Sequence, residues 1–242
     1  MKVKLLIFVF LLINIRLSFG QEDRDENTLQ WDYPIKPGTK EWATLRTWDE
    51  KYDVCQIPAD ILNKMSTKEL ARICVNYPLF LTYPPRFDER QGVNFLIKRF
   101  NGLWELSQRK DGVQELIKAY ANYPVLTKFD KNNISEDYPV IKLPFLELVL
   151  ADSLFISRLN TEELNEFKKN VLNKYADKIQ NSTIYSSSNI NRTMLLAVII
   201  IDRQSKMEKT TEQQEMIQNF IENYMYTESD LVTKISKIIA EL

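Results

Sequence analysis

Two similar ten-residue stretches of the chain both end in Asn-Tyr-Pro, and they lie 46 residues apart. They are Glu69–Pro78 and Glu115–Pro124. Each begins with Glu-Leu and continues with apolar residues at the spacing of a short amphipathic helix. Proline pushes the residue before it out of the helical region, and asparagine tolerates the left-handed conformation that ends many helices. We therefore expect two short helices with defined ends, belonging to a repeated helical unit.

The whole chain is predicted to be all-α, because no segment shows the two-residue alternation of a convincing β-strand. Helix-start signals and apolar faces indicate about nine helices in a single domain over residues 31–242. A 46-residue repeat has the length of a two-helix solenoid repeat, which favours a HEAT-like stack of helical pairs. Two copies are fewer than the three that such arrays usually need, so a closed helical bundle stays an alternative.

Three predicted helices have long apolar faces. One continuous helix should turn inward Val93, Leu96, Ile97, Phe100, Leu103 and Trp104. A second continuous and strongly apolar helix should run over Leu143–Leu159. A third, started by Asn160 with Glu163 three residues later, should turn inward Leu164, Phe167, Val171, Tyr175 and Ile179.

Polar and apolar segments mark further helix ends. Ser66–Glu69 has the sequence of a capping box, in which a hydroxyl and a carboxylate satisfy each other's backbone N–H groups. Asp111 is predicted to cap the helix that follows. Asn181–Ser188 is predicted to be a polar linker. Met194–Ile201 contains eight apolar residues in a row, too few to span a membrane, and is predicted to be a helix buried on all sides.

Three of the four tryptophans fall within eighteen residues, at Trp31, Trp42 and Trp48. Large aromatic side chains more often pack a core than stack on a ligand, so we favour packing over a ligand-binding platform. Trp48, Tyr52 and Cys55 recur at i, i+4 and i+7, the spacing of one helix face. We expect all three to be buried together.

The chain contains no histidine, which excludes several kinds of active site. Neither a Ser-His-Asp nor a Cys-His nucleophile can be assembled, and imidazole acid–base catalysis is excluded. Two cysteines without histidine are also too few for a structural zinc site. An enzyme built on this chain would have to use carboxylates, lysine or tyrosine. The sequence therefore leans away from an enzyme, and it names no catalytic residue, cofactor or metal ligand.

The net charge argues against a nucleic-acid partner. The full chain carries −1, and removal of residues 1–20 leaves 29 basic and 33 acidic residues. A nucleic-acid binder needs a basic surface that displaces counterions from phosphates. Partners are instead expected among proteins or glycans outside the cytoplasm.

The N-terminus has the layout of a secretory signal peptide. Residues 1–20 combine a short basic start, an apolar run from Leu5 to Ile15 and small residues before Gln21, which predicts cleavage after Gly20. An uncleaved N-terminal anchor is the alternative. Residues 21–30 are polar and acidic and are predicted to be a flexible leader. We expect a secreted or periplasmic protein without a transmembrane helix after signal removal.

Two motif-like matches have better structural explanations. Asp130–Asp137 is similar to a calcium loop, but Ile134 occupies a ligand position and Ser135 replaces the turn glycine. Glu228-Ser229 is similar to the catalytic glutamate of cell-wall lytic transglycosylases, but it lies within a helix-capping sequence and lacks the glycine-rich continuation.

One part of the chain resembles a group of exported bacterial all-helical proteins that have no assigned activity. The resemblance rests on Cys55-Gln56-Ile57-Pro58, Met65-Ser66-Thr67, Asn76-Tyr77-Pro78-Leu79, Phe100-Asn101-Gly102-Leu103, Glu105-Leu106 and Arg109-Lys110-Asp111. It covers about residues 33–120. It implies export and a helical fold, but neither a cofactor nor a site residue.

Cys55 and Cys74 are candidates for a disulfide, since both lie on apolar faces of a chain expected in an oxidising compartment. A bridge would contribute about 3 kcal/mol. Members of the group that the chain resembles have an aliphatic residue at the position of Cys74, which implies that a bridge would be peculiar to this chain. Two buried free cysteines are the slightly favoured alternative.

The leading functional hypothesis is a non-enzymatic binding or scaffolding protein of the bacterial envelope or exterior. The second is a carboxylate-dependent hydrolase that acts on cell wall or glycan. The third is a structural or stress protein of the envelope that has no specific ligand.

Overall fold

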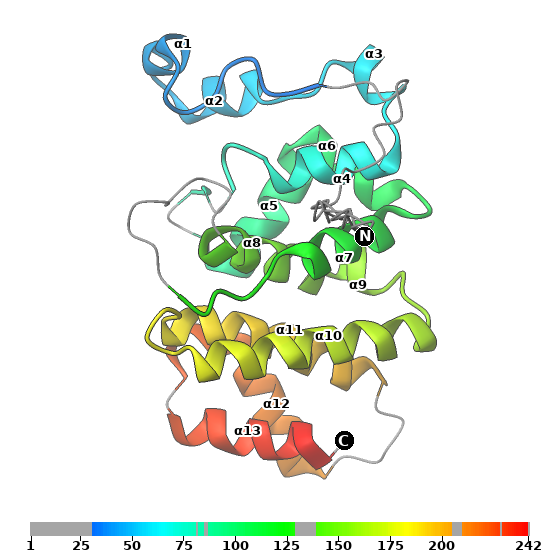
Figure 1. Ribbon diagram of the computed structural model, residues 1–242, viewed down its shortest axis with the longest axis vertical. Helices are drawn as coiled ribbons and strands as arrows, with labels where there is room; N and C mark the ends of the chain where they lie inside the picture. The colour runs from blue at the N-terminus through cyan, green and yellow to red at the C-terminus, as the bar shows by residue number, and fades with distance from the viewer. Residues whose placement is uncertain are drawn as a thin grey trace, which may run out of the picture.

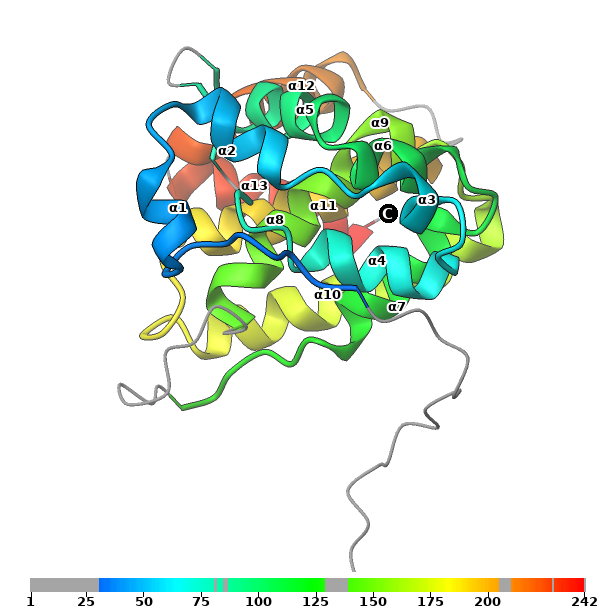
Figure 2. The same ribbon diagram turned by 90° about the horizontal axis from the view of Figure 1, so that it is seen from above.

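The computed structural model describes residues 31–80, 82–84, 87–128, 139–204, 210–227 and 229–241. Every regular element in these ranges is helical, which confirms the all-α prediction. The chain runs from its N-terminal helices at one end of the molecule to its C-terminal helices at the other (Figure 1). Seen from above, helices of successive levels lie over one another (Figure 2). The predicted signal peptide and leader, the loop Asp130–Asp137 and Glu228 lie outside the described residues.

Thirteen α-helices and one 3-10 helix occupy the described ranges, so the prediction of about nine helices was too low. They are α1 (Lys40–Thr44), α2 (Trp48–Val54), α3 (Ala59–Leu62), α4 (Thr67–Val75), α5 (Glu89–Arg99), α6 (Asn101–Gln108), α7 (Gly112–Asn122), α8 (Pro139–Ala151), α9 (Ser153–Ile156), α10 (Thr161–Gln180), α11 (Ser187–Gln204), α12 (Thr211–Asn223), η1 (Tyr224–Tyr226) and α13 (Ser229–Glu241).

The predicted continuous helix through Val93 and Trp104 is wrong, because the chain breaks between α5 and α6. Phe100 leaves the helical region, with φ −96° and ψ 115°. The Asn101 backbone N–H donates to Gln56 Oε1 at 2.9 Å, and the Asn101 amide donates to the Ile57 carbonyl at 2.8 Å. The Gln56 amide also donates to the Arg99 carbonyl at 3.3 Å, so Gln56 satisfies backbone groups on both sides of the break. Trp104 is consequently 46% exposed rather than buried.

The predicted apolar helix over Leu143–Leu159 is also broken, at Asp152. The Asp152 carboxylate accepts the Leu154 backbone N–H at 2.9 Å and so starts α9. Its second oxygen accepts the Asn94 amide of α5 at 3.0 Å. A local cap and a contact with a distant helix together end α8.

The two similar stretches, Glu69–Pro78 and Glu115–Pro124, contribute most of α4 and α7, which we call the echoed helices. These helices pack against each other. Neither helix ends in a left-handed residue: Asn76 has φ −94°, and Tyr123 is extended at φ −77°. The prolines that follow therefore account for both helix ends.

The starts of α4 and α7 differ from prediction. Ser66 accepts the Glu69 backbone N–H, but the Glu69 carboxylate binds Arg72 and leaves the capping box half formed. Asp111 does not cap α7 through its side chain. Its carboxylate instead accepts the Thr67 hydroxyl at 2.9 Å and links the starts of the two helices.

Helix α8 contains an internal proline whose missing hydrogen bond is replaced from another helix. Pro144 has no N–H to donate to the carbonyl four residues earlier, which belongs to Val140. The Asn189 side chain of α11 donates to that carbonyl at 3.1 Å.

The polar linker predicted over Asn181–Ser188 ends earlier than expected, because α11 already begins at Ser187. The apolar run Met194–Ile201 lies within α11 and is buried except for the half-buried Ile199.

We expect Asn189→Ala to destabilise the protein by about 1 kcal/mol, because the Val140 carbonyl would lose its hydrogen-bond donor. In a Pro144→Ala background the new backbone N–H supplies that donor, so the same change should cost less than half as much. Urea unfolding followed by far-UV circular dichroism measures both costs. Asn173→Ala on the exposed face of α10 is the control. An equal cost of Asn189→Ala in both backgrounds would contradict this assignment.

Candidate functional site

Helix α10 turns two lysines toward the core where the sequence predicted apolar residues. Its buried stripe ends in Lys174 and Lys178, spaced i and i+4. Tyr175 is only half-buried, and Ile179 is 46% exposed, so the prediction that they face inward is wrong for Ile179. The two lysines continue the three- and four-residue spacing of Leu164, Phe167 and Val171. That spacing was the only sequence signal that could have located them.

The Lys178 ammonium lies in a fully buried polar cluster, which also contains Glu147, Thr193 and Tyr120. Its Nζ is 2.8 Å and 3.1 Å from the two carboxylate oxygens of Glu147, and 2.8 Å from Thr193 Oγ1. The Thr193 hydroxyl donates to Glu147 Oε1 at 2.8 Å. The Tyr120 hydroxyl donates to the same oxygen at 3.3 Å. The cluster joins α7, α8, α10 and α11.

Burial governs the charges of this cluster. Neither Lys178 nor Glu147 has any exposed side-chain surface. Burial lowers the pKa of Lys178, and the neighbouring Glu147 carboxylate opposes that shift. Burial also raises the pKa of Tyr120 well above its ordinary value, so its hydroxyl stays a donor at neutral pH. Lysine, carboxylate and hydroxyl are a combination that can perform acid–base chemistry, but here they saturate one another away from solvent.

Lysines also bind the carboxyl-terminal ends of the two echoed helices. Lys142 Nζ donates to the Val75 carbonyl at the end of α4 at 3.2 Å. Lys174 Nζ donates to the carbonyls of Ala121 and Tyr123 at the end of α7. Val75 and Ala121 are 46 residues apart, the same separation as the two similar stretches. A cation is favourable there because the helix dipole is negative at its carboxyl end.

Arginines bind the chain segments that precede the same two helices. Arg109 donates to the carbonyls of Leu62 at 2.9 Å and Met65 at 2.6 Å, just before α4. Arg158 donates to the Ser107 carbonyl, just before α7. Ser107 follows Leu62 by 45 residues, and Arg158 follows Arg109 by 49. The carbonyls that accept these contacts therefore recur with the two helices, whereas the cations that donate to them are 32 residues (Lys142 and Lys174) and 49 residues (Arg109 and Arg158) apart.

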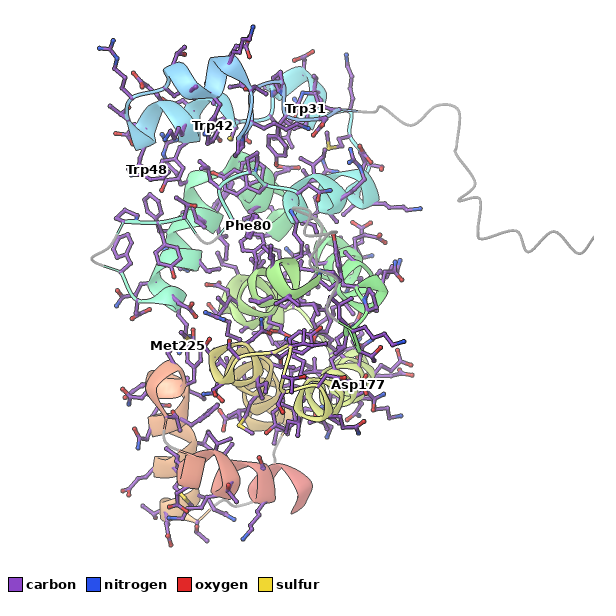
Figure 3. The ribbon with its side chains drawn as sticks, turned by 60° about the vertical axis from the view of Figure 1, so that its left-hand side comes forward. Trp31, Trp42, Trp48, Phe80, Asp177 and Met225 are labelled. Carbon is purple, nitrogen blue, oxygen red and sulfur yellow. The ribbon has the colours of Figure 1, made fainter. Side chains whose placement is uncertain are left out.

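Exposed aromatic surface gathers at the N-terminal end of the molecule, around Trp48. Its side chain is 56% exposed, so the prediction that it is buried with Tyr52 and Cys55 is wrong, whereas those two residues are buried. The Lys51 ammonium lies over the Trp48 ring at 4.5 Å from the centroid and over the Trp42 ring at 5.7 Å. Figure 3 shows Trp42 and Trp48 on the same side of this end. We call Trp42, Lys51 and Trp48 the tryptophan–lysine patch.

A shallow depression lies on the opposite face of α2. It is lined by Thr44, Leu45, Arg46, Glu50, Asp53 and Val54. The Glu50 carboxylate accepts the backbone N–H groups of Arg46 and Thr47 at 2.6 Å and 2.9 Å. Asp53 accepts from Arg99 at 2.6 Å. Both carboxylates of the depression are therefore engaged in holding α2.

Cys55 and Cys74, the candidates for a disulfide, are both buried and free in the structure. Burial raises the pKa of Cys55 to about 12 and raises that of Cys74 well above its ordinary value. A thiol reacts through its ionised form, so neither side chain is a reactive nucleophile at neutral pH. The bridge itself stays a hypothesis.

Comparison with known proteins adds no relative: no family model, no curated protein and no solved structure matches the chain. Within the described ranges, no cluster of three or more acidic or cysteine side chains could hold a metal ion. The described helices also include none that is both long and apolar enough to cross a bilayer.

We expect Lys178→Met to destabilise the protein by about 3–5 kcal/mol, because it leaves the Glu147 carboxylate buried without its cation. The double variant with Glu147→Met should cost less than Lys178→Met alone, since no unpaired charge remains. Urea unfolding of both single variants and the double variant measures the coupling. Lys169→Met, on the exposed face of α10, is the control. Additive costs of the two single changes would show that the cluster does not act as a unit.

Alkylation distinguishes the free thiols from the bridge. In native protein we expect iodoacetamide to modify neither Cys55 nor Cys74, because both are buried and un-ionised. In unreduced protein unfolded in guanidinium we expect two adducts by mass spectrometry, and one in a Cys55→Ala variant. No adduct in the unreduced, unfolded wild type would establish the bridge instead.

Proposed function

We propose that the chain is a non-enzymatic binding or scaffolding protein that acts outside the cytoplasm, built as a short stack of helical pairs. The export part of the proposal rests on the signal-peptide sequence of residues 1–20 and on the resemblance to exported bacterial proteins. The binding part rests on one observation, the exposed tryptophan–lysine patch. The stack rests on the repeated contacts around α4 and α7.

Three observations support a stack of pairs over a closed bundle. The echoed helices lie side by side, as equivalent helices of neighbouring repeats do. Lys142 and Lys174 donate to matching carbonyls of the two helices, those of Val75 and Ala121, which are 46 residues apart. The levels also follow the order of the chain from end to end (Figure 1), whereas a closed bundle brings distant helices around one axis.

The tryptophan–lysine patch favours binding because its Trp48 side chain contributes little to the core, whereas Trp42 is partly buried against it. Trp48 is the most exposed of the large apolar side chains in the described part of the chain. The Lys51 ammonium lies 4.5 Å from the centroid of its ring, a contact that favours one orientation of the indole. A pre-oriented, exposed tryptophan loses little conformational freedom on binding, and tryptophan is among the residues that contribute most at interfaces.

The competing hypothesis is a carboxylate-dependent hydrolase of cell wall or glycan. Glu147 is the most deeply buried carboxylate of the described residues, and burial is what usually prepares a carboxyl group to act as an acid. However, Lys178, Thr193 and Tyr120 already surround it with hydrogen bonds. That arrangement supports a structural role for Glu147.

A binding measurement with matched tryptophan variants tests the proposal. Residues 21–242 are immobilised and titrated with a bacterial envelope extract and with purified peptidoglycan. We expect saturable binding that Trp48→Ala weakens by about tenfold or more, since a buried interface tryptophan commonly costs over 2 kcal/mol when truncated. Trp104→Ala, which removes the other exposed tryptophan, should leave the binding unchanged.

Two outcomes would contradict the proposal. No saturable partner in either preparation would support a structural protein without a ligand. Clearing of the cell wall in a zymogram would support the hydrolase.

A further inference from the structure

Helix α11 is buried on two opposite sides. On one side Asn189 and Thr193 bind α8, through the Val140 carbonyl and the Glu147 carboxylate. Asn191, Leu195 and Val198 recur at i, i+4 and i+7 on the other side. They are 5%, 0% and 2% exposed. The second side therefore also needs a covering element.

The C-terminal helices provide this covering element. Helices α12 and α13 and the η1 turn all contact α11. The Asn191 amide donates to the Tyr224 carbonyl at 2.8 Å. Ile217, Phe220, Tyr224 and Ile235 are the buried apolar side chains that these elements contribute among those described. We call residues 211–227 and 229–241 the C-terminal cover.

The cover forms the last level of the described helices (Figure 1). Its main packing is against α11, and single hydrogen bonds reach α5 and, between Ser236 and Tyr175, α10. A level at the end of such an arrangement gives up fewer apolar contacts on separation than a level enclosed on both sides. Regions with fewer buried apolar contacts open at lower free energy than the rest of a fold. By this argument the cover separates at lower free energy than α8, α10 or α11, which are packed between other helices.

A polar cluster fastens the cover to α5. The Arg192 guanidinium binds both carboxylate oxygens of Glu89, with 2.9 Å between Nε and Oε2. The Tyr224 hydroxyl donates to the same Oε2 at 2.8 Å. Arg90 donates to the Ile221 carbonyl at 3.4 Å. We call Glu89, Arg192 and Tyr224 the Glu89 latch, and its charged side chains are 13% and 16% exposed.

We propose that the C-terminal cover opens as a unit from α11 and that the Glu89 latch sets how often it does so. Opening breaks the Tyr224–Glu89 hydrogen bond, together with the contacts that Asn191, Arg90 and Tyr175 make with the cover. It keeps the Arg192–Glu89 ion pair, because Arg192 and Glu89 both belong to the part that stays folded. It uncovers the Leu195 and Val198 side chains of α11, which are buried in the closed state. This inference is independent of the tryptophan–lysine patch.

Hydrogen–deuterium exchange of the full mature chain, read peptide by peptide, tests the proposal. In the wild type we expect the amides of the cover to exchange faster than those of α8 and α10. Tyr224→Phe removes only the hydroxyl that reaches Glu89, and it should speed exchange of the cover by about tenfold. Exchange of α8 and α10 should stay unchanged.

A matched variant separates the latch from the surface charges of the cover. Lys234→Met breaks the exposed ion pair with Asp230 on α13 and should leave exchange of the cover unaltered. Equal exchange of the cover, α8 and α10 in the wild type would overturn the proposal. So would a Tyr224→Phe protein in which all peptides accelerate together, because the latch would then stabilise the whole fold rather than the closed cover.

Discussion

The carbonyl groups at the carboxyl ends of short helices are the constraint on which this structure depends. Each helix leaves up to four such groups without an internal partner, and a buried carbonyl without a donor costs free energy. A fold with many short helices has many of these ends, and several lie between helices rather than in water. Lys142, Lys174 and Arg109 supply donors from helices that come later in the chain. The cations that satisfy one level thus also attach the next level to it.

The same requirement explains one of the two lysines that α10 buries, and a carboxylate explains the other. The side chain of Lys174 reaches carbonyls at the end of α7, and that of Lys178 reaches a carboxylate on α8. Replacing a buried ion pair by apolar residues is often neutral or stabilising, so Glu147 and Lys178 need not increase the net stability. We expect them to add specificity, because the observed register of α8, α10 and α11 brings Glu147, Lys178 and Thr193 within hydrogen-bonding distance.

Local sequence predicted the features that depend on neighbouring residues. The Asn160–Glu163 capping box and the buried apolar run of α11 are confirmed, because capping and hydrophobic burial follow from residues within a few turns. The break between α5 and α6 was missed, since it depends on Asn101 meeting Gln56 from 45 residues away. The buried cluster was missed for a related reason: a lysine such as Lys178 is expected to face solvent until its carboxylate partner is placed.

The position of a level in the chain then decides which residues are available for recognition. A level between two others must satisfy its polar groups and bury its apolar side chains on both sides, as α11 does, so its residues are committed to packing. The first and last described levels have a neighbour on one side only. Trp48 can therefore remain exposed while Tyr52 and Cys55 on the same helix face are buried. The cover over Leu195 likewise has one neighbouring level, and we propose that it separates from α11. The exposed tryptophan and the C-terminal cover thus both lie at levels where packing leaves one side free of the neighbours that enclose the middle of the molecule.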